Sequence, residues 1–71
     1  MTNLHDLLGI LNKEQFCLVT YYDAGRHAEK RESGTAWLLW HNHPEWGLVK
    51  VTRCEWWEVE KVVNIVGEAI L

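Results

Sequence analysis

The residues whose types and spacing could do chemistry gather in the stretch WLLWHNHPEWG, which spans residues 37–47. His41 and His43 lie two positions apart, and on an extended strand this spacing points both imidazoles to the same side, a geometry that can ligate zinc. Further ligands would have to be glutamates or residues without the spacing typical of zinc sites, namely Cys17, Cys54, His5 and His27. We therefore interpret the two histidines as surface or turn residues and keep a small zinc-binding domain as an alternative hypothesis.

The four residues HNHP, at positions 41–44, resemble the His-x-His-Pro motif of the JAMM/RadC-like metal-binding domains. In that family two histidines and a downstream aspartate hold zinc. This chain has no aspartate after Pro44, lacks the serine that the family places between these ligands, and has only 71 residues, too few for the family's fold. The resemblance therefore carries no prediction of that activity.

Nucleophilic catalysis has weaker support in the sequence. Cys17 and Cys54 lie in apolar stretches, where burial raises the pKa of a thiol and suppresses its reactivity. Ser33 is the single serine and has no recognisable base beside it, and the chain contains no glycine-rich phosphate loop. Because so small a core also leaves little room for a substrate pocket, we predict a chain without enzymatic activity and without a cofactor.

Aromatic residues are abundant, with five tryptophans, two tyrosines and one phenylalanine. One small core cannot easily bury all of them. We expect Trp37 and Trp40 to lie in the core, whereas Trp46, placed in a turn, and one of Trp56 and Trp57 should be exposed. Exposed tryptophan, tyrosine and arginine are typical of protein interfaces. The residues predicted to bind a partner are Trp46, Trp56, Trp57, Tyr22, Arg26 and Arg31.

Hydrophobic periodicity predicts the elements that would position these residues. Leucines at positions 4, 7, 8 and 11 have the spacing of one helix face. Residues 16–22, rich in β-branched and aromatic side chains, predict a strand. The polar residues 23–34 predict a long loop or a short edge strand near 26–31. The N-terminal half thus provides one helix followed by one or two strands.

The C-terminal half predicts two strands and a helix. Residues 35–41 are apolar on both faces of an extended chain, as in a central strand covered on both sides. Residues 48–57 are cleanly apolar on neither face, which favours a strand at or near an edge. Residues 59–70 place valines and an isoleucine on one helical stripe with charged residues opposite, so their period predicts an amphipathic helix.

The predicted fold is a small single α+β domain over residues 1–71, in the order α-β-β-β-α. Its three-stranded antiparallel meander, with or without a fourth short edge strand, packs against two helices. Composition and charge bound the class of function. The net charge of −3 argues against a general nucleic-acid binder. Two cysteines are too few for the disulfide framework of a small secreted domain, and neither a leader nor a membrane-spanning apolar run is evident, so we expect a cytoplasmic location and no membrane partner.

The leading hypothesis is a non-enzymatic protein-protein interaction module, a regulator or inhibitor, with a phage-type inhibitor of host machinery as one candidate. The predicted contact surface is an aromatic sheet face together with loop 23–34. The predicted partner is a protein, with a basic nucleic-acid-binding protein or a second copy of the chain as candidates. The alternative is nucleic-acid binding, in which Tyr21, Tyr22 or Trp40 would stack bases beside a cationic group made of Arg26, Lys30, Arg31, Lys50 and Arg53.

Overall fold

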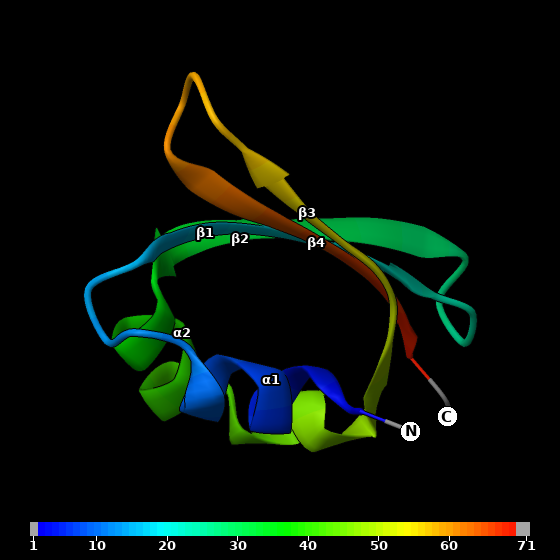
Figure 1. Cartoon of the computed structure of the whole chain (residues 1–71). Coiled ribbons are helices and arrows are strands. Elements are labelled where there is room, and N and C mark those ends of the chain that lie inside the picture. The colour runs from blue at the N-terminus through cyan, green and yellow to red at the C-terminus, as the bar shows by residue number, and fades with distance from the viewer. Residues whose placement is uncertain (1, 70–71) are drawn as a thin grey trace.

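The computed structural model describes residues 2–69 as three helices and four strands (Figure 1). In chain order they are α1 (Leu4–Ile10), β1 (Phe16–Asp23), β2 (Ala28–Thr35), α2 (Ala36–Asn42), the 3₁₀ helix η1 (Pro44–Leu48), β3 (Val49–Trp57) and β4 (Val62–Ala69). The α+β class is as the sequence predicts, but the order of helices and strands differs from α-β-β-β-α. None of the helices in this part of the chain is long and apolar enough to cross a membrane.

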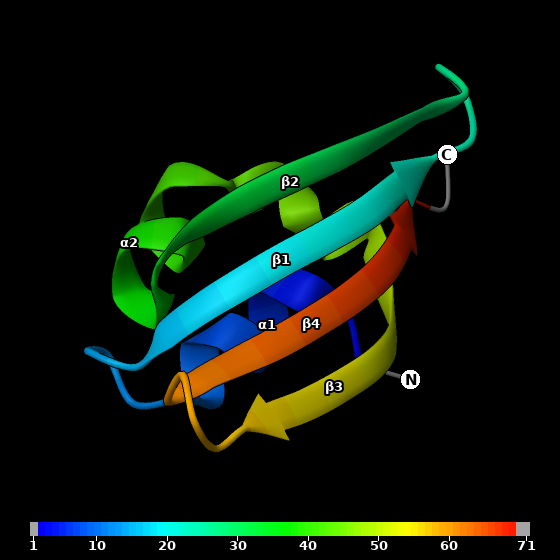
Figure 2. The same ribbon diagram turned by 90° about the horizontal axis from the view of Figure 1, so that it is seen from above.

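The four strands form one mixed sheet in the order β2-β1-β4-β3. β1 and β2 form an antiparallel hairpin, β3 and β4 form a second, and β4 runs parallel to β1 at the centre of the sheet. Figure 2 shows how the chain leaves β2, passes beneath the sheet through α2 and η1, and returns to β3 at the opposite edge. Two antiparallel hairpins therefore replace the predicted three-stranded meander.

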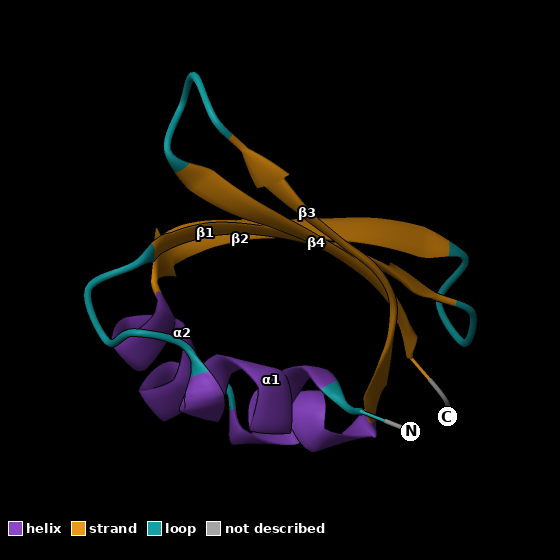
Figure 3. Ribbon diagram, in the orientation of Figure 1, coloured by secondary structure: helices purple, strands orange, loops and turns teal. Residues whose placement is uncertain are grey.

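The helices all lie on one face of the sheet, as Figure 3 shows. Alternate strand residues point toward them, and one core forms between the two layers. The buried core residues are Leu4, Leu8, Cys17, Val19, Ala36, Leu39, Trp46, Val49 and Ile65. No helix within residues 2–69 covers the opposite face of the sheet, so this part of the chain has two layers.

Helix α1 begins at a capping residue and buries one side. The side chain of Asn3 accepts a hydrogen bond from the backbone N–H of Asp6 at 2.8 Å, which satisfies one free donor of the first turn. Leu4 and Leu8 are buried, and Leu7 packs partly buried against the same core. The predicted N-terminal helix is confirmed.

The predicted central strand at residues 35–41 is wrong, because this segment forms helix α2. The hydroxyl of Thr35 accepts a hydrogen bond from the backbone N–H of Leu38 at 3.3 Å and caps the helix. Ala36 and Leu39, three positions apart, are the residues that face the core. A short apolar run fits a covered strand and a helix alike. Here the cap and the spacing of the buried residues decide for the helix.

Within the described residues the predicted helix at 59–70 is also wrong, because Val62–Ala69 is strand β4; Ile70 lies outside the described residues. This strand pairs with β1 on one side and with β3 on the other. Its β-branched side chains suit a central strand: Ile65 lies in the core, and Val66 stands on the opposite face beside Arg53 of β3. β propensity and two neighbouring strands therefore outweigh the helical period of this segment.

The polar residues 23–34 form a tight turn and most of a regular edge strand. Asp23 Oδ1 accepts a hydrogen bond from the backbone N–H of Gly25 at 3.1 Å, and His27 adopts a left-handed conformation with φ 52°, so the chain reverses within the turn. β2 then pairs with β1 from Ala28 to Thr35. The edge strand is therefore longer than the short one expected near residues 26–31.

Trp46 is the largest fully buried side chain, with 1% of its surface exposed. Helix η1 carries it beneath the sheet, where its ring lies edge-on to Tyr21 at a centroid distance of 5.9 Å and stacks on His43 at 4.1 Å. The expectation that Trp46 is exposed is wrong, because its turn folds against the core instead of facing solvent.

Truncation of Trp46 tests its place in the core. Trp46→Ala should lower the free energy of unfolding by about 3–5 kcal/mol, because it removes the largest buried side chain and leaves a cavity. Trp37→Ala is a matched control that removes an exposed indole, and it should cost less than about 1 kcal/mol. Urea unfolding followed by circular dichroism measures both costs. Equal costs would contradict the core position of Trp46.

Gly67 lies where β4 approaches β3 closely. A Cβ atom at this position would meet the backbone oxygen of Lys50 at 2.7 Å and Cγ1 of Val49 at 2.9 Å, which is too close for van der Waals contact. Gly67→Ala should therefore destabilise the domain by about 1–3 kcal/mol. At Gly47 an added Cβ meets nothing within 4 Å, so Gly47→Ala should leave the melting temperature nearly unchanged or slightly raise it. If thermal denaturation shows that both variants melt like the wild type, the two strands do not pair in this register.

Candidate functional site

The sheet face turned away from the helices is here called the outer face. Cys17 and Val19 of β1 point into the core, so the residues that alternate with them point outward. Pairing extends this set across the sheet, because directly opposite residues of neighbouring strands share a face. The outer face consists of even-numbered residues 16–22 of β1 and 62–68 of β4, with odd-numbered residues 29–33 of β2 and 53–57 of β3.

A hollow of about 470 Å³ lies on the outer face. Leu18 and Thr20 of β1 and Asn64 of β4 line it from the two central strands. Arg31 lines it from β2 at one side, and Trp57 lines it from β3 at the other. The hollow therefore combines an apolar and hydroxyl-bearing centre with an indole and a guanidinium at its two sides.

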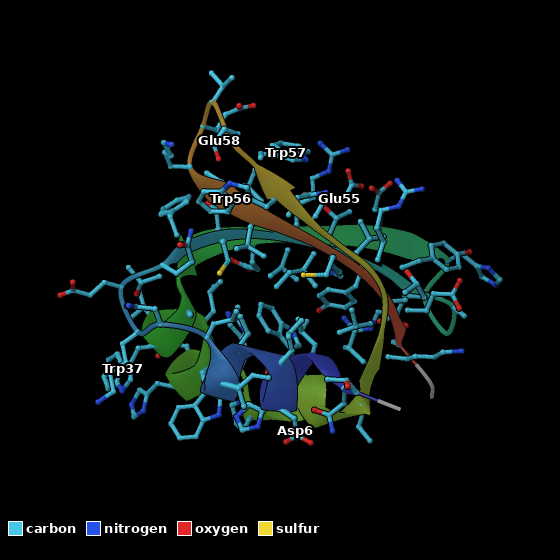
Figure 4. All side chains as sticks on the ribbon, viewed as in Figure 1. Asp6, Trp37, Glu55, Trp56, Trp57 and Glu58 are labelled. Atoms are coloured by element: carbon cyan, nitrogen blue, oxygen red, sulfur yellow. The ribbon has the colours of Figure 1, made fainter. Side chains whose placement is uncertain are left out.

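The end of the β3–β4 hairpin rises above the outer face (Figure 1). The register between β3 and β4 shifts between Val51 and Arg53, and such a bulge bends its strand and increases the local twist. Figure 4 shows Trp57 on this raised hairpin. The bulge thus explains how a residue of the edge strand can stand beside the hollow as a wall.

The charges of the outer face are largely paired. Arg31 Nη2 lies 3.6 Å from Glu29 Oε1, and Arg53 Nη1 lies 3.4 Å from Glu55 Oε1. Exposed pairs of this kind contribute little to stability because water screens them. Their effect is on recognition, since each arginine of this face has a carboxylate beside it.

Three of the six residues predicted to bind a partner share the outer face, namely Tyr22, Arg31 and Trp57. Trp56 points to the other side of the sheet, is 50% exposed, and donates a hydrogen bond from Nε1 to Glu58. The exposure of Trp56 confirms the expectation that one of Trp56 and Trp57 is exposed. Arg26 lies in the turn between β1 and β2, with its Nε 3.8 Å from Asp23 Oδ2. Trp46 lies in the core. Trp56, Arg26 and Trp46 are therefore the three predicted residues that do not lie on the outer face.

The histidines of the HNHP stretch face tryptophans. His41, in the last turn of α2, stacks on Trp37 with ring centroids 5.0 Å apart. His43, just beyond the helix, stacks on Trp46, and its Nδ1 lies 3.1 Å from Glu45 Oε1. The strand geometry that motivated the zinc hypothesis is not formed, because residues 36–42 are helical. Residues 2–69 contain no group of three or more histidine, cysteine or carboxylate side chains that could hold a metal ion.

Exposed aromatic residues on the helical layer are the feature that the sequence prediction missed. Trp37 and Trp40 are 45% and 38% exposed, not buried as expected. Together with Leu8, Leu11 and Lys13 they line a groove of about 280 Å³ between α1 and α2. A helical interpretation of this segment would have indicated their exposure, since only one side of such a helix faces the core.

The two cysteines differ in exposure and in chemistry. Cys17 is fully buried, and burial, with a smaller effect from Cys54, raises the pKa of its thiol to about 11. Cys54 lies on β3, is exposed, and like Cys17 forms no disulfide. The inert character predicted for Cys17 therefore has a physical cause, whereas the predicted burial of Cys54 is wrong.

The two thiols should react at different rates. At neutral pH an aromatic disulfide reagent should modify Cys54 rapidly and Cys17 only as the chain unfolds, because a buried, protonated thiol is a poor nucleophile. In Cys54→Ser the remaining thiol should react at a rate that rises with urea concentration. Equally fast reaction of both thiols without denaturant would contradict the buried position.

The buried thiol of Cys17 also makes stability depend on pH. Since burial raises the pKa of Cys17 above its ordinary value of 9.0, the contribution of this thiol to stability should be lost as the pH rises from 9.0 to about 11.

Comparisons with known protein families, with curated proteins and with solved structures find no match to this chain. A fold alone does not identify a function, which depends on the geometry and chemistry of a site. The function must therefore be inferred from the outer face and its hollow.

Proposed function

We propose that the chain is a non-enzymatic protein-interaction module that binds a protein partner through the outer face and regulates or inhibits that partner by occupying its surface. One observation carries this proposal: a sheet face that no helix within residues 2–69 covers, on which Trp57, Leu18 and Arg31 surround a hollow of about 470 Å³. Interface hot spots are rich in tryptophan, tyrosine and arginine and cluster around well-packed pockets. We place this activity in the cytoplasm, which the two free thiols support.

Most of residues 23–34 belong to strand β2, and a strand supports the proposal better than the predicted loop would. Arg31 and Ser33 of β2 line the hollow, and Glu29 lies beside Arg31 at its rim. A mobile loop loses conformational freedom when it binds, whereas a strand already held in a sheet loses little. The segment therefore offers a preorganised side of the contact surface.

The outer face favours a protein over a nucleic acid. Its two arginines lie 3.6 Å and 3.4 Å from glutamate oxygens, so phosphate groups would meet cations that are already paired. The net charge of −3 adds repulsion from the phosphate backbone. Tyr22 and Trp57 could still stack on bases, so the binding test must be able to detect a nucleic acid as well as a protein.

Acidic side chains near the raised hairpin favour a basic partner. Glu58 and Glu60 lie in the turn that follows Trp57. Hydrogen bonds from Lys61 and from Trp56 hold the pKa of Glu58 below its usual value, and Lys61 pairs with this carboxylate at 2.8 Å. Glu60 takes part in none of the ion pairs formed within residues 2–69, so its charge, with the net charge of −3, is the one that favours a basic partner. A basic nucleic-acid-binding protein is the partner class we propose, because complementary charge raises the association rate and suppresses wrong partners.

Matched variants test the proposal. The tagged wild-type chain, Trp57→Ala and Trp37→Ala would serve as baits in the same lysate, and calorimetry would then measure the affinity of the protein that the wild type captures. Trp57→Ala should weaken that binding by about thirtyfold, a hot-spot loss of about 2 kcal/mol, because the indole walls the hollow. Trp37→Ala removes an indole from the helical layer and should bind like the wild type.

Two results would overturn the proposal. If Trp57→Ala bound normally and Trp37→Ala did not, the interface would be the groove between α1 and α2. If the wild type bound single-stranded oligonucleotides with an affinity that falls steeply as salt rises, the outer face would be a nucleic-acid site. Circular dichroism of each variant shows that a loss of binding does not reflect a loss of fold.

A further inference from the structure

Strand β2 leaves one edge of the sheet open. It pairs with β1 from Ala28 to Thr35 without a register shift and lies at one end of the strand order. In Figure 2 no other strand of residues 2–69 runs along its free edge. The backbone N–H and C=O groups of such an edge can form hydrogen bonds with a further strand. The free edge of β2 is thus a potential contact surface separate from the hollow.

The opposite edge, β3, is less available for pairing. An isolated antiparallel bridge joins Asn3 to Lys50, and the backbone N–H of Val51 donates to the carbonyl of Thr2 at 3.3 Å. The N-terminal residues therefore cover the first part of this edge. The register shift before Arg53 interrupts its ladder further along. β2, in contrast, offers eight residues in regular pairing geometry.

The charges of β2 match a second copy of β2. Residues 29–32 read EKRE, negative at both ends and positive between, and such charges oppose pairing with unrelated apolar strands. In an antiparallel pair with its two-fold axis at Arg31, Lys30 of each copy lies opposite Glu32 of the other. Arg31 already has Glu29 beside it at 3.6 Å in its own copy. Lys30 and Glu32 take part in none of the ion pairs formed within residues 2–69.

Helix α2 gives a second reason for a strand at this edge and selects the register. Leu38 is 45% exposed, and its Cδ2 lies 3.8 Å from the place that a Cβ on Gly34 would take, near the end of β2. Figure 2 shows α2 reaching beyond β2 on this side. With the axis at Arg31, Ala28 of the second copy lies opposite Gly34, and its methyl group would cover Leu38. An axis at either residue places two like charges opposite each other. Each Arg31 has its own Glu29 at 3.6 Å, whereas Lys30 takes part in none of the ion pairs formed within residues 2–69, so the axis at Arg31 is the less repulsive of the two.

We infer that the chain forms a two-fold symmetric dimer in which two β2 strands pair antiparallel about Arg31 and join both sheets into one of eight strands. Each contact of Lys30 with Glu32 and of Ala28 with Leu38 occurs twice, because the interface is isologous. The dimer contact can be tested separately from the proposed function, because Trp57 lies on β3 at the other edge of the sheet, although Arg31 and Glu32 of β2 also line the hollow. A single strand pair is a small interface, so association is reversible and depends on concentration.

Charge exchange across the strand pair tests the dimer. Sedimentation velocity over a concentration series would compare the wild type with Lys30→Glu, with Glu32→Lys and with the double variant. Each single substitution creates two like-charge pairs and should weaken dimerisation at least about tenfold. The double variant restores opposite charges in the same register and keeps the wild-type net charge, so it should dimerise like the wild type.

Two further variants test the apolar contact of the dimer and its independence from the outer face. Leu38→Glu should also weaken dimerisation, whereas Trp57→Ala should leave it unchanged, so the dimer and the proposed partner binding can fail independently. A wild-type chain that stays monomeric throughout the series would overturn the inference. Single charge variants that dimerise normally would overturn it too, as would a double variant that remains monomeric. Circular dichroism controls for the fold of every variant.

Discussion

The parallel contact between β1 and β4 at the centre of the sheet is the constraint on which the rest of the structure depends. Parallel neighbours cannot be linked by a tight turn, so the chain must cross from the β2 edge to the β3 edge before β4 can form. The crossing segment, α2 and η1, runs along one face and brings Leu39 and Trp46 beneath the sheet. One face is therefore covered, no helix of residues 2–69 covers the other, and β2 and β3 become the two edges.

Local sequence signals predicted the elements whose residue types or spacing favour one structure. Residue types identified the strands within 16–22 and 48–57, of which Leu48 belongs to η1, and the N-terminal leucines follow one helix face with a cap before them. In residues 59–70 the spacing of the apolar side chains favours a helix, whereas their β-branched type favours a strand. Pairing with β1 and β3, which lie elsewhere in the sequence, makes this segment a strand. At residues 35–41 the apolar run suits two structures, and the cap at Thr35 was the signal that could have decided.

The candidate site could be predicted only in part, for the same reason. Tyr22 and Trp57 lie in strands that the sequence identified, and the pairing of those strands places them on one face. Trp46 was misjudged because a turn is not always a surface feature: η1 packs its indole between Tyr21 and His43. In a domain with so little interior, burying one such ring replaces the area that several aliphatic side chains would otherwise supply.

The central strand pair also dictates the order in which the fold can assemble. Each hairpin is local and can form within roughly 1–10 μs, whereas the contact of β1 with β4 joins positions as distant as Cys17 and Val63. Closing so long a loop costs chain entropy before its contacts can stabilise anything. Until then β1 and β4 are themselves unpaired edges, open to strands of other nascent copies. The speed of this one closure thus sets how long these edges stay exposed to aggregation.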